Sequence, residues 1–73
     1  MRTLDKIKPG EQVKIVKLNG KGLLRRRIME MGITKNLIVK VIKVAPFGDP
    51  MQLNVRGYEL SLRKFESSLI EVE

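Results

Sequence analysis

Three consecutive arginines form the densest group of chemically active side chains in this sequence. Arg25, Arg26 and Arg27 lie in the segment GLLRRRIMEMG, residues 22–32. Arginine clusters bind carboxylates and phosphates through paired N–H donors. Arginines on a solvated helix face are the alternative, with Glu30 close enough along a helix to pair with Arg26 or Arg27. The sequence leaves both interpretations open.

The segment APFGDP, residues 45–50, is a second candidate. Pro46 and Pro50 fix their own φ and bias the residues before them to extended conformations, while Gly48 provides a turn. We therefore expect a rigid, hairpin-like connection between two strands. Phe47 at its tip can insert into a partner with little loss of entropy. The candidate partner-binding residues are Arg25, Arg26, Arg27, Pro46, Phe47, Gly48, Asp49, Pro50 and Arg56.

Most catalytic and metal-binding chemistry is missing from the chain, which has no histidine and no cysteine. Nucleophilic catalysis with an imidazole base is excluded, as are imidazole and thiolate metal sites. The eight carboxylates are scattered, without the spacing of a calcium loop or of a paired acid and base. We predict that the protein is not an enzyme, and that it has no catalytic residue, no cofactor and no metal site.

Length and charge narrow the range of partners. The 73 residues are expected to form one domain, residues 1–73, and the net charge of +7 favours an anionic partner: nucleic acid, a membrane surface or an acidic protein. The chain has three aromatic residues, too few for a base-stacking platform, so no stable nucleic-acid complex is expected. No segment is long and apolar enough for membrane insertion. The thiol-free composition suits the cytoplasm.

The elements that position these residues are mostly strands. Residues 51–63 alternate with period two and are interrupted at Gly57, which predicts two half-buried strands joined by a tight turn or a sharp corner. Residues 37–45 are rich in β-branched side chains and indicate a strand with a largely covered surface. Residues 13–18 and 69–72 indicate further strands. Five short strands predict a small closed or nearly closed barrel.

One segment is expected to be helical. Leu24, Ile28 and Met31 recur at i, i+4 and i+7, and Gly32 lies where a helix would end in a left-handed cap. A helix of about nine residues is too short to be stable alone. We therefore expect its apolar face to pack against the barrel.

The segments RRRIMEMGI (25–33), VAPFGDPMQLNVRGYELSLRKFES (44–67) and LIEVE (69–73) together resemble the FeoA family. This resemblance implies a mainly β fold, a small SH3-like barrel of about five strands with one or more short inserted α-helices. It implies a non-enzymatic accessory protein of ferrous iron uptake that docks on the cytosolic GTP-binding part of the FeoB transporter. The family is often described as binding transition metals. Its members commonly have Pro-Gly after the helix, where this chain has Lys35-Asn36.

Other functions remain open. PGEQVKIVKLNGKG, residues 9–22, is similar to the opening of a KOW motif, which would make the chain a basic barrel that binds RNA or the ribosome. A carboxylate-based ferrous-iron chaperone is a third hypothesis. An open strand edge would also allow weak homo-oligomers.

Overall fold

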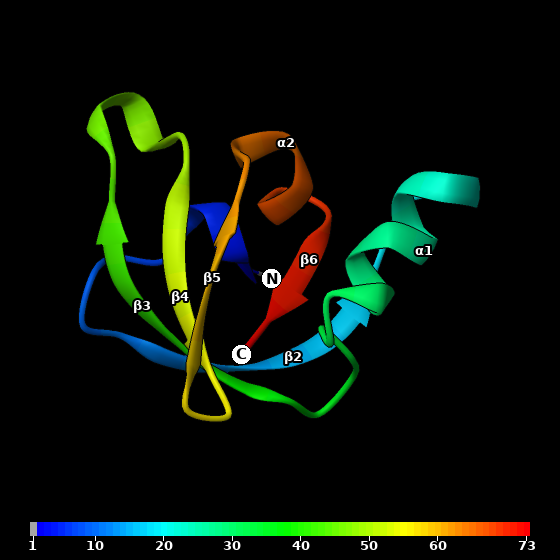
Figure 1. Ribbon diagram of the computed structural model, residues 1–73, viewed down its shortest axis with the longest axis horizontal. Coiled ribbons are helices and arrows are strands. Elements are labelled where there is room, and N and C mark those ends of the chain that lie inside the picture. Colours follow the sequence, from blue (N-terminus) through cyan, green and yellow to red (C-terminus); the bar gives the residue numbers. More distant parts are fainter. Residues whose placement is uncertain (1) are drawn as a thin grey trace.

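The structure is a computed structural model that describes residues 2–73, and its strands form one strongly curved antiparallel sheet (Figure 1). The strand order is β1-β6-β2-β3-β4-β5. The strands are β1 (Arg2–Thr3), β2 (Gln12–Leu18), β3 (Ile38–Val44), β4 (Met51–Val55), β5 (Tyr58–Leu62) and β6 (Ile70–Val72). The helices are α1 (Gly22–Glu30) and α2 (Lys64–Ser67), and two 3-10 turns are η1 (Leu4–Lys6) and η2 (Pro46–Gly48).

The predicted mainly β architecture is confirmed, with one strand more than the five expected. β2 closes the curve because a register shift between Ile15 and Lys17 lets its first half pair with β3 and its second half with β6. The additional strand, β1, pairs with β6 through only two residues. A strand that short produces no alternating pattern in the sequence.

The β4–β5 hairpin has the predicted turn. Val55 pairs with Tyr58, and the two residues between them, Arg56 and Gly57, both have positive φ values, 51° and 87°. This is a tight two-residue turn rather than a corner. Met51, Leu53 and Val55 of β4 are all buried as expected.

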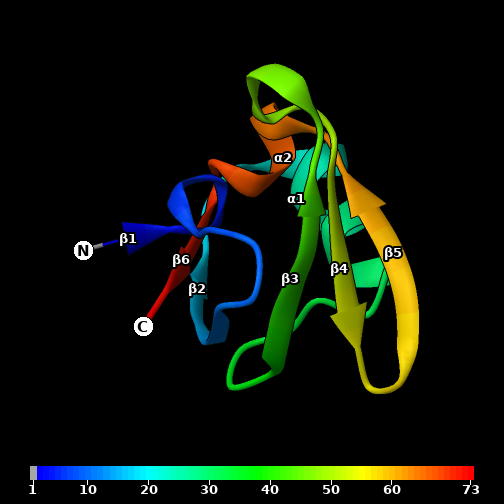
Figure 2. The same ribbon diagram turned by 90° about the vertical axis from the view of Figure 1, so that its left-hand side faces the viewer.

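The predicted burial holds less well on β5 and β3. On β5, Leu62 is buried, whereas Tyr58 is 47% exposed because β5 is an edge strand. On β3, Val39 and Val41 are buried but Ile38 is 45% exposed, so the expected covered surface is wrong for one face. Among residues 2–73, no helix packs on that face of β3 (Figure 2), and Ile42 on the same strand is also 40% exposed.

Helix α1 docks on the barrel through the predicted face. Ile28 is fully buried, and Leu24 and Met31 are partly buried against the core. Gly32 ends the helix at φ 92°, and the Tyr58 hydroxyl donates a hydrogen bond of 3.3 Å to the Met31 carbonyl. A Cβ at Gly32 would lie 2.7 Å from the Tyr58 hydroxyl oxygen, so the backbone conformation favours glycine and any other residue would displace the Tyr58 hydroxyl.

Asn36 has a φ of 74°, so asparagine takes the left-handed conformation in the turn before β3. The core beneath α1 and the sheet is formed mainly by aliphatic side chains. None of the helices in residues 2–73 has the length and apolar character that crossing a bilayer requires.

Candidate partner-binding surface

The loop between β3 and β4 is a compact turn, as predicted. Val44 pairs with Met51, the Ala45 amide donates to the Pro50 carbonyl at 3.0 Å, and the Gly48 amide donates to the Ala45 carbonyl at 2.8 Å. Gly48 has the expected positive φ of 76°. These bonds hold the loop in one shape independently of any partner.

Phe47 is the exceptional residue of this loop. Its φ is 67°, in the left-handed region that side chains other than Gly, Asn and Asp rarely adopt, and it is 97% exposed. The strained backbone therefore carries a phenyl ring that contributes almost nothing to the core. The sequence indicated the exposed tip, but it gave no sign of the strain, because the two flanking prolines account for an ordinary turn.

Asp49 fixes the loop to the start of α2. Its Oδ1 accepts a hydrogen bond from the Lys64 amide at 3.1 Å, and its carboxylate faces the Arg63 guanidinium at 3.1 Å (Nε–Oδ1) and 3.3 Å (Nη2–Oδ2). This two-point geometry is the strong, orienting form of an arginine–carboxylate pair. Asp49, predicted as a binding residue, thus acts as a positioning residue for the loop. Arg63 was missed because it lies far from Asp49 in the sequence.

Two exposed apolar side chains lie on the elements that meet at this end of the barrel, which we call the apolar end. They are Phe47 of the η2 loop and Phe65 of α2, with exposed fractions of 97% and 56%, and the hydrogen bond from the Lys64 amide to Asp49 joins their two elements. Figures 1 and 2 show α2 next to the η2 loop, whereas the first turn of α1 lies on the far side of α2 from that loop. An open hollow of about 370 Å³ adjoins the loop and is lined in part by Val44, Pro46 and Pro50.

The three arginines do not form one cluster. Successive helical residues point about 100° apart, and each arginine of α1 has a different neighbour. The Arg25 Nη1 donates to the Met29 sulfur at 3.4 Å, Arg26 pairs with Glu30 at 3.9 Å, and Arg27 approaches Glu66 of α2 at 4.0 Å. The predicted Arg26–Glu30 pair is confirmed. The sequence did not reveal that Arg27 faces α2.

Glu66 is the buried carboxylate at the junction of α1 and α2. It is 3% exposed, and its Oε1 accepts a hydrogen bond of 2.8 Å from the Arg63 amide. With Arg27 on its other side, this carboxylate links the two helices that border the apolar end. The surface next to Phe65 is therefore held in place from two directions.

Arg56 lies apart from the other candidate residues. It is in the β4–β5 turn, whereas the Pro46–Pro50 loop precedes the first residue of β4, so the two are at opposite ends of that strand. Both views of the molecule show this separation (Figures 1 and 2). One partner surface of small size cannot include both groups.

One surface carboxylate, Glu11, has a lowered pKa. The Lys8 amide donates to Glu11 Oε1 at 3.0 Å and lowers the pKa of Glu11 from its ordinary value of 4.5, with a smaller contribution from Arg2. Arg2 Nη1 lies 3.3 Å from Glu11 Oε2. This group stabilises the turn before β2 and lies away from the apolar end.

Few side chains of this protein are of the types that bind transition metals. The chain has neither histidine nor cysteine, and no three carboxylates come together anywhere in residues 2–73. These residues do not match a zinc site, which uses imidazole, thiolate and carboxylate ligands in groups of three or four.

Comparison with known proteins identifies the family. Residues 2–73 match the FeoA domain. The chain is 37% identical over 70 residues to a Porphyromonas gingivalis protein named as an Fe(2+) transport protein A/Fe(2+) transporter FeoB fusion protein. The match covers 96% of this chain and 8% of that relative, so the chain spans less than a tenth of the fusion protein.

Solved structures show the same fold. An NMR structure of a FeoA-like protein from Clostridium acetobutylicum is 39% identical with a TM-score of 0.89, and the match covers 97% of this chain and 83% of that one. The crystal structure of Stenotrophomonas maltophilia FeoA complexed with zinc, described as an SH3 domain protein, has a TM-score of 0.86 at 21% identity. That match covers 100% of this chain and 91% of that one, and at this identity it shows the fold alone. The chain therefore belongs to the FeoA family, which is associated with ferrous iron transport, and it has the SH3-like fold predicted from its sequence.

Proposed function

We propose that this protein is a non-enzymatic, cytoplasmic accessory protein of ferrous iron uptake that docks on the cytosolic GTP-binding part of a FeoB transporter. The observation that carries the proposal is the fusion relative, in which a segment similar to this chain is joined to FeoB in one protein. Covalent linkage keeps two domains at a high effective concentration, which favours a pair that works in contact.

The apolar end is the surface best suited to this contact. A left-handed conformation costs an L-residue about 1–2 kcal/mol, and at Phe47 this strain presents a fully exposed ring. Backbone strain that folding does not require is characteristic of binding sites. The Asp49–Arg63 pair holds the ring ready for insertion, so little entropy is lost on docking.

Positively charged side chains lie around the apolar end. Arg27 of α1, which faces Glu66, and Lys64 of α2, whose side chain lies beside Gly48, border the exposed apolar residues and are mostly exposed themselves. Positive charge around an apolar centre favours a partner with an apolar pocket inside an acidic rim, since complementary charge accelerates association and fixes orientation. We propose Phe47 as the central contact and these cations as the border.

Isothermal titration calorimetry with the soluble GTP-binding domain of the cognate transporter tests the proposal. We expect saturable binding at near-physiological salt in at least one of three states: nucleotide-free, with GDP, or with a non-hydrolysable GTP analogue. Reversal of charge by Lys64→Glu should weaken that binding by about twofold to fivefold, as expected for an exposed ion pair. Lys40→Glu, on β3 at the other end of the barrel, is the matched control and should leave it unchanged. Absence of binding in all three states would overturn the proposed partner.

A further inference from the structure

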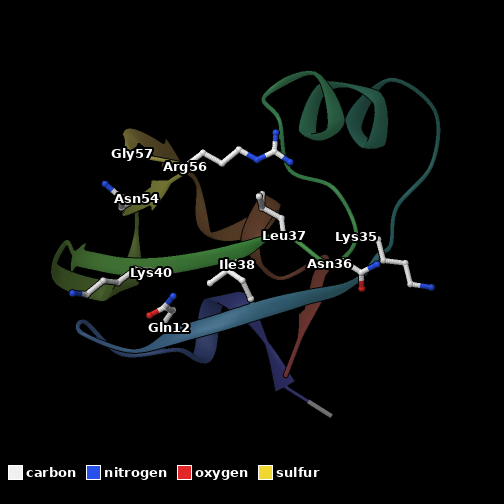
Figure 3. A pocket seen from close by; sticks show the side chains of 9 residues that line it. All are labelled: Gln12, Lys35, Asn36, Leu37, Ile38, Lys40, Asn54, Arg56 and Gly57. Atoms are coloured by element: carbon white, nitrogen blue, oxygen red, sulfur yellow. The ribbon is translucent and has the colours of Figure 1, made fainter.

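A wide hollow lies at the end opposite Phe47, between the β4–β5 turn and the first residues of β3. It has a volume of about 620 Å³ and is open to solvent. Three cations, Lys35, Lys40 and Arg56, line it together with the amides Gln12, Asn36 and Asn54. We call this hollow the basic groove (Figure 3).

The groove has positive charge without a compensating acid. None of its lining residues is acidic, and within residues 2–73 Lys35, Lys40 and Arg56 take part in no ion pair. Of the acids on adjoining residues, Glu11 pairs with Arg2, while Glu59 accepts a hydrogen bond from the neutral Gln52 amide and keeps its charge. The three cations that line the groove therefore outnumber this one neighbouring acid.

The arrangement of the cations favours an extended ligand. In Figure 3, Arg56 reaches from the turn over Leu37, while Lys35 and Lys40 extend from the two ends of the groove. Ile38, which is 45% exposed, adds apolar surface beside them. Separated charges on an apolar and amide-rich floor suit a chain with repeated carboxylates better than a single compact ion.

Arg56 provides a second, independent observation. It has a φ of 51° at the first central position of a tight hairpin turn, where Asn, Asp or Gly is strongly preferred because an L side chain is strained there. An Arg56→Asn change would suit the turn better, so folding alone does not account for arginine. The strain places a guanidinium over the groove, in the same way that strain at Phe47 presents a ring at the apolar end.

We propose that the basic groove is a second binding site, for an extended acidic segment of a protein partner. Glutamate and aspartate side chains would pair with Arg56, Lys35 and Lys40, and the amides of Asn36, Asn54 and Gln12 would bind the backbone of the segment. A single-stranded nucleic acid fits less well, because no aromatic residue lines the groove and base stacking needs one. This site goes beyond the proposed docking function, since it lies at the other end of the barrel.

Titration of 15N-labelled protein with an acetylated and amidated hexaglutamate peptide tests this site by NMR. We expect saturable shifts of the Asn36, Arg56 and Gly57 amides that weaken as salt is raised. Arg56→Asn should reduce affinity about three- to tenfold while the turn is retained. Lys21→Asn is the matched control, since it removes the same charge at the N-cap of α1, where asparagine is also favoured.

Three results would overturn the proposal. The first is the absence of saturable NMR shifts for the amides of the groove. The second is an equal loss of hexaglutamate affinity in Arg56→Asn and Lys21→Asn, which would mean that net charge alone attracts the peptide. The third is tighter binding of hexauridylate than of hexaglutamate at the same residues, which would assign the groove to RNA as the KOW-like segment suggests. Binding of the transporter domain should be unchanged by Arg56→Asn, so the two proposals fail or succeed separately.

Discussion

Replacement of Phe47 by glycine should make the protein more stable and its partner binding weaker. Glycine removes about 1–2 kcal/mol of left-handed strain, and its greater freedom in the unfolded chain returns about 0.4–1 kcal/mol. Because Phe47 is 97% exposed, its removal sacrifices almost no burial. The free energy of unfolding should therefore change by about 0 to 1.5 kcal/mol in the stabilising direction.

Replacement of Phe47 by glycine should weaken partner binding, although it stabilises the fold. Full burial of a phenylalanine side chain is worth about 1.5–3 kcal/mol, so loss of the ring should raise the dissociation constant for the GTP-binding domain about 10- to 150-fold. Phe47→Ala separates the two effects. It should lose the same affinity, but without the gain in stability, since alanine stays strained at a φ of 67°.

Urea unfolding and calorimetric titration of the same preparations provide both numbers. Ile38→Ala is the control, because Ile38 is an exposed apolar residue at the opposite end and should leave affinity unchanged. Destabilisation of more than about 1 kcal/mol by Phe47→Gly would show that the ring supports the fold. Unaltered affinity in both Phe47 variants would remove the loop from the interface.

Three further predictions concern groups that hold the fold and the loop. Gly32→Ala should cost about 0.5–3 kcal/mol in urea unfolding: about 1–2 kcal/mol from strain and about 0.5–1.5 kcal/mol from loss of the Tyr58 hydrogen bond, less about 0.4–1 kcal/mol because alanine has less freedom in the unfolded chain. Gly10→Ala, at a similar φ of 91° but with nothing within 4 Å, should cost clearly less, and equal costs would contradict the Tyr58 contact. Asp49→Asn should lower the free energy of unfolding by less than about 1 kcal/mol, because the Asp49–Arg63 ion pair is partly exposed to solvent. It should also increase the fast backbone motion of the loop, measured by 15N relaxation. Unchanged order parameters in the loop would rule out a positioning role for Asp49. Because the pKa of Glu11 is lowered in the folded state, its ionised carboxylate should stabilise the fold fully above the ordinary pKa of 4.5, and this contribution should be lost as the pH falls through the lowered pKa. A Glu11→Gln variant should therefore lose less stability in acid. An unchanged dependence of stability on pH would be inconsistent with the Lys8 contact.

The regular elements were predictable because their signals are local. The alternation of Met51, Leu53 and Val55 follows from one face of β4 being buried, and the i, i+4, i+7 spacing on α1 follows from one helix face contacting the core. Gly57 and Gly32 marked the turn and the helix end through their backbone freedom. Each of these features is encoded within a few neighbouring residues.

The features that the sequence did not reveal depend on contacts between distant segments. Asp49 meets Arg63, and Arg27 meets Glu66, only after the barrel has closed. The strain at Phe47 has no signal either, because phenylalanine is a poor choice for its conformation and no local rule predicts a poor choice. By contrast, the separate directions of the three arginines could have been predicted from helical geometry alone.

Mapping the contact surface tests the central claim most directly. Unlabelled GTP-binding domain of the cognate transporter, loaded with a non-hydrolysable GTP analogue, would be titrated into 15N-labelled protein. The account predicts saturable changes centred on the Phe47, Gly48 and Phe65 amides, with the Arg56 and Gly57 amides unaffected. Changes centred on Arg56, or no saturable change at any amide, would contradict docking through the apolar end.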